Sequence, residues 1–174
     1  MSILAHYLHS TKASLGFVCE TKCSVQQATR RIRRLPLKNY EIVPSAGLSG
    51  GLWLLWDDNL LVSVLERSHF FIFASIKKHV DDDPWILGGA IYGDPNGWVL
   101  GYIWDQISFY ANSHHIPLCV MGDFNCILHP SEKCGGSSKE KSKNKGFQSM
   151  VSRTGLIDLG HDGPAYTWCN FQQS

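Results

Sequence analysis

The sequence predicts an α/β sandwich, a fold in which packed β-strands are covered by helices. Two observations predict it. Short apolar runs of strand length, such as residues 52–56 and 118–121, are bounded by turn residues. Residues 3–12 and 98–114 instead carry apolar residues at helical spacing. Because a meander of strands is followed by helical crossovers, an all-α or all-β fold is excluded.

The elements follow from these patterns in chain order. Ser24 is a suitable N-cap for a short helix, and the arginines near the C-terminal end of that helix suit the helix dipole. Residues 133–145 are polar, glycine-rich and basic, so they predict an exposed loop. We expect helices at 3–12, 24–34, 98–114 and 147–153, and strands at 15–19, 40–43, 52–56, 61–65, 70–77, 85–92 and 117–123.

Composition indicates one globular domain over residues 1–174. Hydrophobic residues make up 44% and charged residues 18%, which is enough apolar material for a core. The net charge of +1 argues neither for nor against a nucleic-acid partner. Basic side chains nevertheless gather in two clusters. We interpret them as a solvated helix face and an exposed loop in preference to a binding surface. The clusters are Arg30, Arg31, Arg33, Arg34 and Lys38, and Lys133, Lys139, Lys141, Lys143 and Lys145.

The sequence shows no pattern typical of a membrane-spanning segment or a signal peptide. No apolar run reaches the roughly 18 residues that a membrane span needs, and His6, His9 and Lys12 interrupt any N-terminal signal segment. We therefore expect an intracellular protein that is neither secreted nor membrane-bound. Its six cysteines are expected to be reduced thiols, because the absence of a signal segment places them in a reducing compartment. Their spacing lacks the paired halves of a zinc site.

The most informative segment is the strand that runs into Gly122, Asp123 and Asn125. Sites in α/β proteins collect where buried strands end, and glycine permits a sharp turn there. If the segment stays extended, Asp123 and Asn125 project to the same side. A carboxylate beside a carboxamide suits a hard metal ion, a water molecule and a phosphate oxygen.

Two further strand ends carry polar groups, so that one sheet edge could present Glu20, Tyr92, Asp123 and Asn125 together. Glu20 fits as a Mg²⁺ ligand, and Asp123 fits as a carboxylate that orients a water. Asn125 and Tyr92 would donate hydrogen bonds to phosphate, which is adequate for phosphoryl transfer. Taken singly, each acidic residue is more often a cap or turn residue, and Tyr92 is more often a packing residue.

Five ordered motifs give the sequence a resemblance over nearly its whole length. They are residues 17–22 (FVCETK), 50–56 (GGLWLLW), 91–95 (IYGDP), 121–125 (MGDFN) and 163–170 (GPAYTWCN). Together they resemble the endonuclease/exonuclease/phosphatase (DNase I-like) superfamily, most closely the endonuclease domain of plant LINE-type (non-LTR) retrotransposons.

The resemblance implies a four-layer α/β sandwich of two packed mixed β-sheets flanked by helices. It also implies hydrolysis of DNA phosphodiester bonds with Mg²⁺, or with Mn²⁺ in its place. Glu20 falls on the metal ligand, Tyr92 on the phosphate contact, and Asp123 and Asn125 on the groups that orient water and hold phosphate. Thr167 and Trp168 are weaker candidates for DNA contact. The resemblance also implies that a full-length element carries a reverse transcriptase domain as a partner, and that the protein resides in the nucleus.

Departures from the family pattern predict a fragment. No metal-binding Asn motif precedes Glu20, no Ser-Asp-His motif follows, and Asp94 stands where a Pro is usual. We therefore expect an incomplete sandwich, truncated at both ends, poorly soluble and weakly active or inactive, because residues of such sites act as a unit.

Two alternatives remain open at this stage. The same fold could act on a phosphoinositide, a sphingolipid or RNA, since fold does not fix function. The chain could instead be a non-catalytic nucleic-acid-binding remnant that uses its basic clusters.

Overall fold

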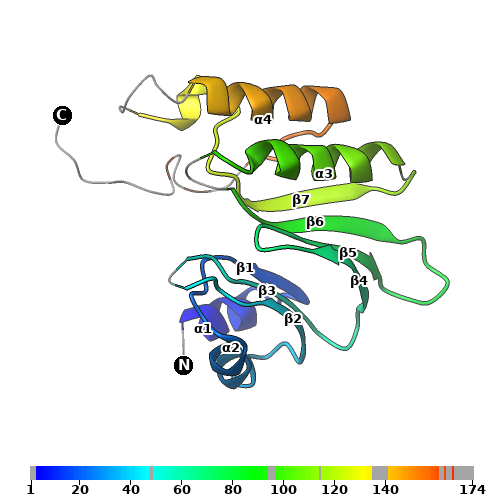
Figure 1. Ribbon diagram of the computed structural model, residues 1–174. Helices are drawn as coiled ribbons and strands as arrows, with labels where there is room; N and C mark the ends of the chain where they lie inside the picture. Colours follow the sequence, from blue (N-terminus) through cyan, green and yellow to red (C-terminus); the bar gives the residue numbers. More distant parts are fainter. Residues whose placement is uncertain are drawn as a thin grey trace.

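Two β-sheets lie face to face between two pairs of helices in the computed structural model, which describes residues 3–47, 49–93, 97–113, 115–134, 141–160, 163 and 166 (Figure 1). The helices are α1 (Ile3–Ser10), α2 (Val25–Ile32), α3 (Leu100–Ser113) and α4 (Lys141–Thr154), with a 3-10 turn at Pro130–Glu132. The strands are β1 (Leu15–Val18), β2 (Asn39–Val43), β3 (Leu52–Trp56), β4 (Leu61–Arg67), β5 (Ile72–Lys77), β6 (Trp85–Tyr92) and β7 (Leu118–Asp123).

The two sheets differ in strand direction. The first sheet has the order β1-β3-β2 with antiparallel neighbours throughout. The second has the order β4-β5-β6-β7, antiparallel except for the parallel pair β6 and β7. Helix α3 connects these two parallel strands, as a crossover must. The mixed character predicted for both sheets therefore applies to the second sheet only.

Strand β3 explains why its sequence is apolar at every position. Leu52 and Leu54 face the second sheet in the layer between the sheets, whereas Trp53 and Leu55 pack against α1 and α2. Successive side chains of a strand point to opposite faces, and both faces of β3 are covered. A continuous apolar run is what such a strand requires.

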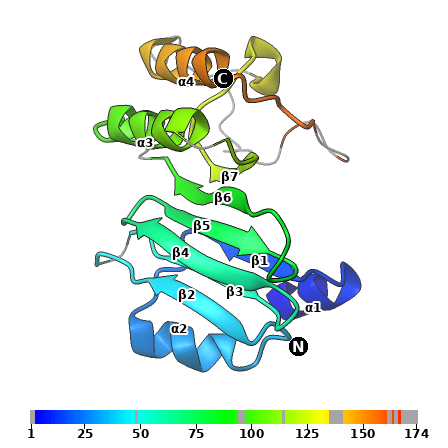
Figure 2. The ribbon, with the colours of Figure 1, turned by 90° about the vertical axis from the view of Figure 1, so that its right-hand side faces the viewer.

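Strand β5 of the second sheet is likewise covered on both faces. Ile72, Ala74 and Ile76 lie in the inter-sheet layer, and Phe73 packs with the residues of α3 and α4 on the outer face. Figure 2, turned by 90°, shows the resulting order of layers, with α1 and α2 outside one sheet and α3 and α4 outside the other. The predicted four-layer α/β sandwich is confirmed.

Most predicted elements are present, with ends that differ by a few residues. Ser24 caps α2 as expected, and a reciprocal bond between the Gln27 side chain and the Ser24 backbone completes a capping box. The predicted loop at 133–145 is wrong from Lys141 onward, where α4 already begins. Buried Phe147 and Met150 anchor that helix, and lysine is a good helix former in the preceding turn. None of the helices that the structure describes has both the length and the apolar character of a membrane crossing.

Candidate functional site

The ends of β6 and β7 form one half of the site. Tyr92 and Asp123 are paired neighbours at the ends of these parallel strands, and the Gly93 N–H donates to the Asp123 carbonyl at 2.7 Å. A Cβ atom on Gly93 would overlap the Phe124 carbonyl, and one on Gly122 would overlap the Ile91 backbone. Glycine at both positions therefore lets the two strand ends approach closely.

Asn125 locks this strand end in a tight turn. Its backbone N–H donates to Asp123 Oδ1 at 2.9 Å, and its Nδ2 donates to the Gly93 carbonyl at 2.6 Å. Its φ of 49° is left-handed, so the expected extended geometry at Asn125 is wrong. The reason is local, since an Asp side chain readily closes a turn on the amide two residues later. Asp123 itself remains exposed to solvent.

Glu20 comes from the other sheet, two residues beyond the end of β1. The prediction that one sheet edge carries all four residues is therefore wrong, although Glu20 and Asp123 both lie close enough to Tyr92 to act on its hydroxyl. Three of the four non-glycine residues with positive φ in the described part of the chain are Glu20, Lys22 and Asn125. Such left-handed residues are strained and tend to gather at functional sites.

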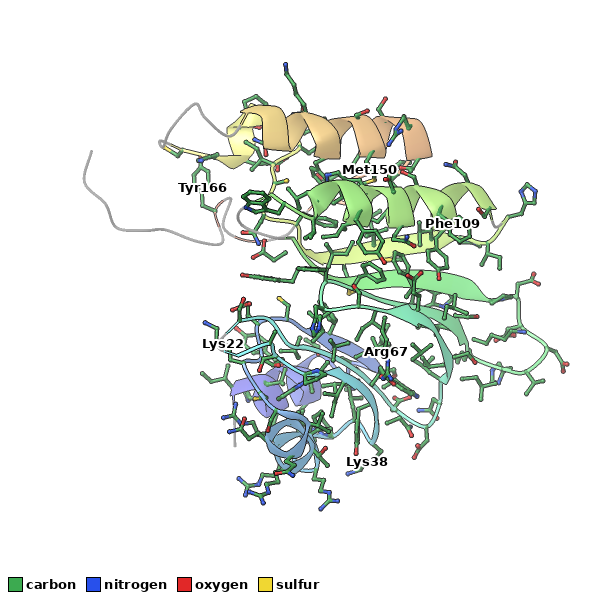
Figure 3. The ribbon with its side chains drawn as sticks, viewed as in Figure 1. Lys22, Lys38, Arg67, Phe109, Met150 and Tyr166 are labelled. Carbon is green, nitrogen blue, oxygen red and sulfur yellow. The ribbon has the colours of Figure 1, made fainter. Side chains whose placement is uncertain are left out.

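The Glu20 carboxylate has several partners. Its Oε1 accepts from the Gly50 N–H at 2.8 Å, and its Oε2 lies 3.4 Å from Lys22 Nζ. Figure 3 shows Lys22 at the edge of the first sheet, with its side chain directed to solvent. The carboxylate is half-buried, so solvent and ligands can reach it.

Residues from both sheets influence the pKa of Tyr92. Burial is the largest of several causes that together raise the pKa of Tyr92 to about 12; the others are the charge of Glu20, a hydrogen bond to Glu20 and the charge of Asp123. Burial, followed by the charge of Asp123, also raises the pKa of Cys19. Tyr92 therefore interacts with a carboxylate from each sheet, and its hydroxyl stays protonated at neutral pH.

The donor set fits a divalent cation of the magnesium type. Mg²⁺ keeps several waters and is usually bound by one or two carboxylates plus substrate phosphate. Glu20 and Asp123 are two carboxylates of this kind. Within the described ranges, no group of three or more His, Cys, Asp or Glu side chains forms a complete cage. Such a partial set agrees with a metal held jointly by protein, water and substrate.

Two predicted contacts cannot be placed. Thr167 and Trp168 lie outside the described residues, as does Asp94, whereas the neighbouring Tyr166 is exposed. Sequence reasoning gave no role to Lys22 or to the Gly50–Gly51 pair. The double glycine directly before β3 was a signal for a turn of unusual backbone geometry.

The four layers of this architecture are those of a DNase I-like α/β sandwich. The chain is similar in structure to the AP endonuclease LMAP from Leishmania major, with a TM-score of 0.62 and 12% sequence identity. The match covers 87% of this chain and 60% of the Leishmania chain. No protein-family model and no curated protein matches the chain. At this identity the likeness concerns the fold, and the chain spans about 60% of the length of that structure.

Proposed function

We propose that this chain hydrolyses phosphodiester bonds in DNA with the help of Mg²⁺. The observation that carries the proposal is the meeting of Glu20, from the first sheet, with Tyr92 and Asp123, from the second. Two carboxylates beside a neutral hydroxyl would repel a phosphate unless a bound cation neutralises their charge. The same donor set accepts Mn²⁺.

Glu20 is the metal ligand in this proposal, with Oε1 held by the Gly50 N–H and Oε2 facing Lys22. A bound Mg²⁺ polarises a phosphate oxygen and neutralises the charge that develops on it. The contact between Lys22 and Glu20 is exposed and therefore weak, so it would not prevent Oε2 from serving as a metal ligand.

Tyr92 and Asn125 hold the phosphate. The Tyr92 hydroxyl is protonated, because its pKa is raised to about 12, so it remains a hydrogen-bond donor. The Asn125 amide donates one N–H to the Gly93 carbonyl and keeps its second N–H for a phosphate oxygen. The bond to Gly93 fixes the direction of that second donor.

Asp123 orients the attacking water. Its Oδ1 is bound by the Asn125 backbone, which fixes the carboxylate plane. Because Asp123 is exposed, its second oxygen would be available to accept a hydrogen bond from the attacking water. This division of the two oxygens makes Asp123 a positioned acceptor.

The finer assignment is an endonuclease of plant LINE-type retrotransposon origin, and it rests on the ordered motifs. In a full-length element it would act beside a reverse transcriptase domain in the nucleus, with Thr167 and Trp168 against the DNA. The solved neighbour is itself named an endonuclease, which favours nucleic acid over a phosphoinositide or sphingolipid substrate. Its name does not decide between this assignment and cleavage of RNA.

Nicking of supercoiled plasmid in Mg²⁺ tests the proposal. We expect a low rate of nicking by the chain, still above background, and background levels after addition of EDTA or for Asp123→Ala. Circular dichroism and a melting curve establish that both proteins are folded. A folded chain whose nicking equals that of Asp123→Ala contradicts the proposal.

A second candidate function is non-catalytic binding of nucleic acid. The arginines of α2 and its C-terminal extension are exposed, and none pairs with a carboxylate within the part of the chain that the structure describes. Lys38, at the lower end of Figure 3, lies on this side, away from Lys22. DNA binding that weakens with salt and survives Asp123→Ala, without nicking by the parent chain, would favour this function.

A further inference from the structure

We propose that Gly51, acting through Thr21, is a positioning residue for the Glu20 carboxylate. The consequence for metal binding rests on the proposed function, whereas the positioning itself does not. The turn at Gly50 and Gly51 precedes β3, and the turn at 20–22 follows β1, so the two turns are neighbours in the first sheet.

Three hydrogen bonds join these two turns. The Thr21 N–H donates to the Gly51 carbonyl at 3.2 Å, and the Lys22 N–H donates to the Gly50 carbonyl at 3.0 Å. The Gly50 N–H donates in return to Glu20 Oε1 at 2.8 Å. Both the backbone beside Glu20 and its carboxylate are therefore bound to one turn.

The turn at 20–22 needs this support. Glu20 has a φ of 54° and Lys22 a φ of 49°, which side chains with a Cβ rarely adopt. Without the bonds from Gly50 and Gly51 these residues would relax toward extended backbone. Relaxation would move Glu20 away from Tyr92, and the two halves of the site would separate.

Gly51 is the position at which this support depends on residue size. Its φ is 91°, and a Cβ there would overlap Thr21 Oγ1 and lie 3.3 Å from the Ser45 nitrogen. Thr21 Oγ1 is buried without a hydrogen-bond partner in the described structure. A side chain at position 51 would therefore displace Thr21 through its volume, without breaking a hydrogen bond of Thr21 Oγ1.

The chain supplies a matched control. Gly47 belongs to the same connection and has a φ of 63°, but a Cβ there would have nothing within 4 Å. Both substitutions place a Cβ at a positive φ, but only Gly51→Ala presses on Thr21. Reversal of the effect of Gly51→Ala by Thr21→Ala then separates this contact from backbone strain at position 51.

The experiment uses the NMR signal of the Tyr92 ring carbon that carries the hydroxyl, assigned with Tyr92→Phe. Because this hydroxyl is hydrogen-bonded to Glu20, its signal reports the position of Glu20 with or without metal. We expect Gly51→Ala to shift the signal and Gly47→Ala to leave it unchanged. In the double variant Gly51→Ala with Thr21→Ala, the signal should return most of the way to its position in the parent chain.

A second readout is the Mg²⁺ concentration for half-maximal nicking. Loss of a group that orients a metal ligand typically costs at least about tenfold in metal affinity, so Gly51→Ala should raise this concentration by about tenfold. The rate at saturating Mg²⁺ should change less. If no protein nicks DNA, the proposed function fails while the Tyr92 signal still decides the positioning role.

An unchanged Tyr92 signal in Gly51→Ala, or an equal shift in Gly47→Ala, would overturn the inference. If Gly51→Ala does not fold, Thr21→Ile crowds the same contact without altering a backbone angle. That variant should shift the Tyr92 signal in the same direction, and an unshifted signal there would equally overturn the inference.

Discussion

At the scale of single residues, the site is governed by Tyr92 and the two carboxylates beside it. Tyr92 ends one strand of the second sheet and hydrogen-bonds to Glu20 from the first. Tyr110, on α3, stands in a similar relation to Glu66, since its hydroxyl lies 3.3 Å from Glu66 Oε2. In both cases burial and a neighbouring negative charge oppose formation of the phenolate.

Tyr92 and Tyr110 should therefore ionise late in an alkaline titration. Each has a pKa raised to about 12, and the ordinary value is about 10. Since the native state keeps these protons longer than the unfolded chain, their stabilisation is present below pH 10 and is lost as the pH rises through 12. Near-ultraviolet absorbance should show a late phase that shrinks in Tyr92→Phe and in Tyr110→Phe. A phase of unchanged size in both variants would refute this.

At the scale of elements, the junction of β6 and β7 depends on two glycines and the turn after them. Gly93 and Gly122 leave room for backbone that would otherwise collide, and the Gly93 N–H holds the Asp123 carbonyl. Asn125 then fastens the end of β7 to the end of β6. The junction fixes where Tyr92 and Asp123 stand relative to each other.

Substitution of Gly93 by alanine should destabilise the fold by about 3 kcal/mol, because the new Cβ meets backbone that has little room to shift. Gly101 is the control, since it lies exposed in α3 and a Cβ there has nothing within 4 Å. Gly101→Ala should stabilise by about 0.5–1 kcal/mol, because glycine inside a helix is entropically costly. Urea unfolding measures both changes, and a Gly93→Ala variant as stable as the parent would disprove the close approach.

Helix α2 offers a second prediction at this scale. Ser24 and Gln27 form a reciprocal capping box at its N-terminus, at 3.4 Å and 3.0 Å. Ser24→Ala should lower the free energy of unfolding by about 1 kcal/mol. The exposed Gln26→Ala is the control in the same turn, and alanine there should cost nothing because it favours helix. Equal effects of the two substitutions in thermal unfolding would argue against the cap.

At the scale of the whole molecule, the site exists only while the two sheets stay packed. Glu20 belongs to one sheet, and Tyr92 and Asp123 belong to the other. The layer between the sheets is apolar, and the ion pair between Arg67 and Glu41 joins β4 to β2 at its margin. Packing between the sheets is therefore a condition of any chemistry at the site.

Leu54→Ala tests whether the site depends on packing between the two sheets. Leu54 is fully buried between the sheets, so its truncation should cost about 3 kcal/mol. It should also shift the Tyr92 NMR signal, since the sheets can then move relative to each other. Leu65 on β4 is 46% exposed, and Leu65→Ala should change stability by about 0.5 kcal/mol or less. A Leu54→Ala variant as stable as Leu65→Ala would contradict the layer assignment.

Much of this fold could be predicted from local pattern. The run at 52–56 predicts a strand covered on both faces, and Ser24 predicts a helix start, because each depends on residues close in sequence. The error at Lys141 has a physical cause, since a helix can extend backward over a polar turn once Phe147 and Met150 are buried. Polar turns give no periodic signal of that extension.

The sequence by itself determined the layers of this protein, the strand ends that carry Glu20, Tyr92 and Asp123, and the residue types suited to a divalent cation. Only the tertiary structure decided that Glu20 faces the other two residues across two sheets, and that Gly50 and Gly51 hold it there. The reason is that periodicity follows from neighbours along the chain, whereas these contacts join residues 30 positions apart through packing that no local pattern encodes.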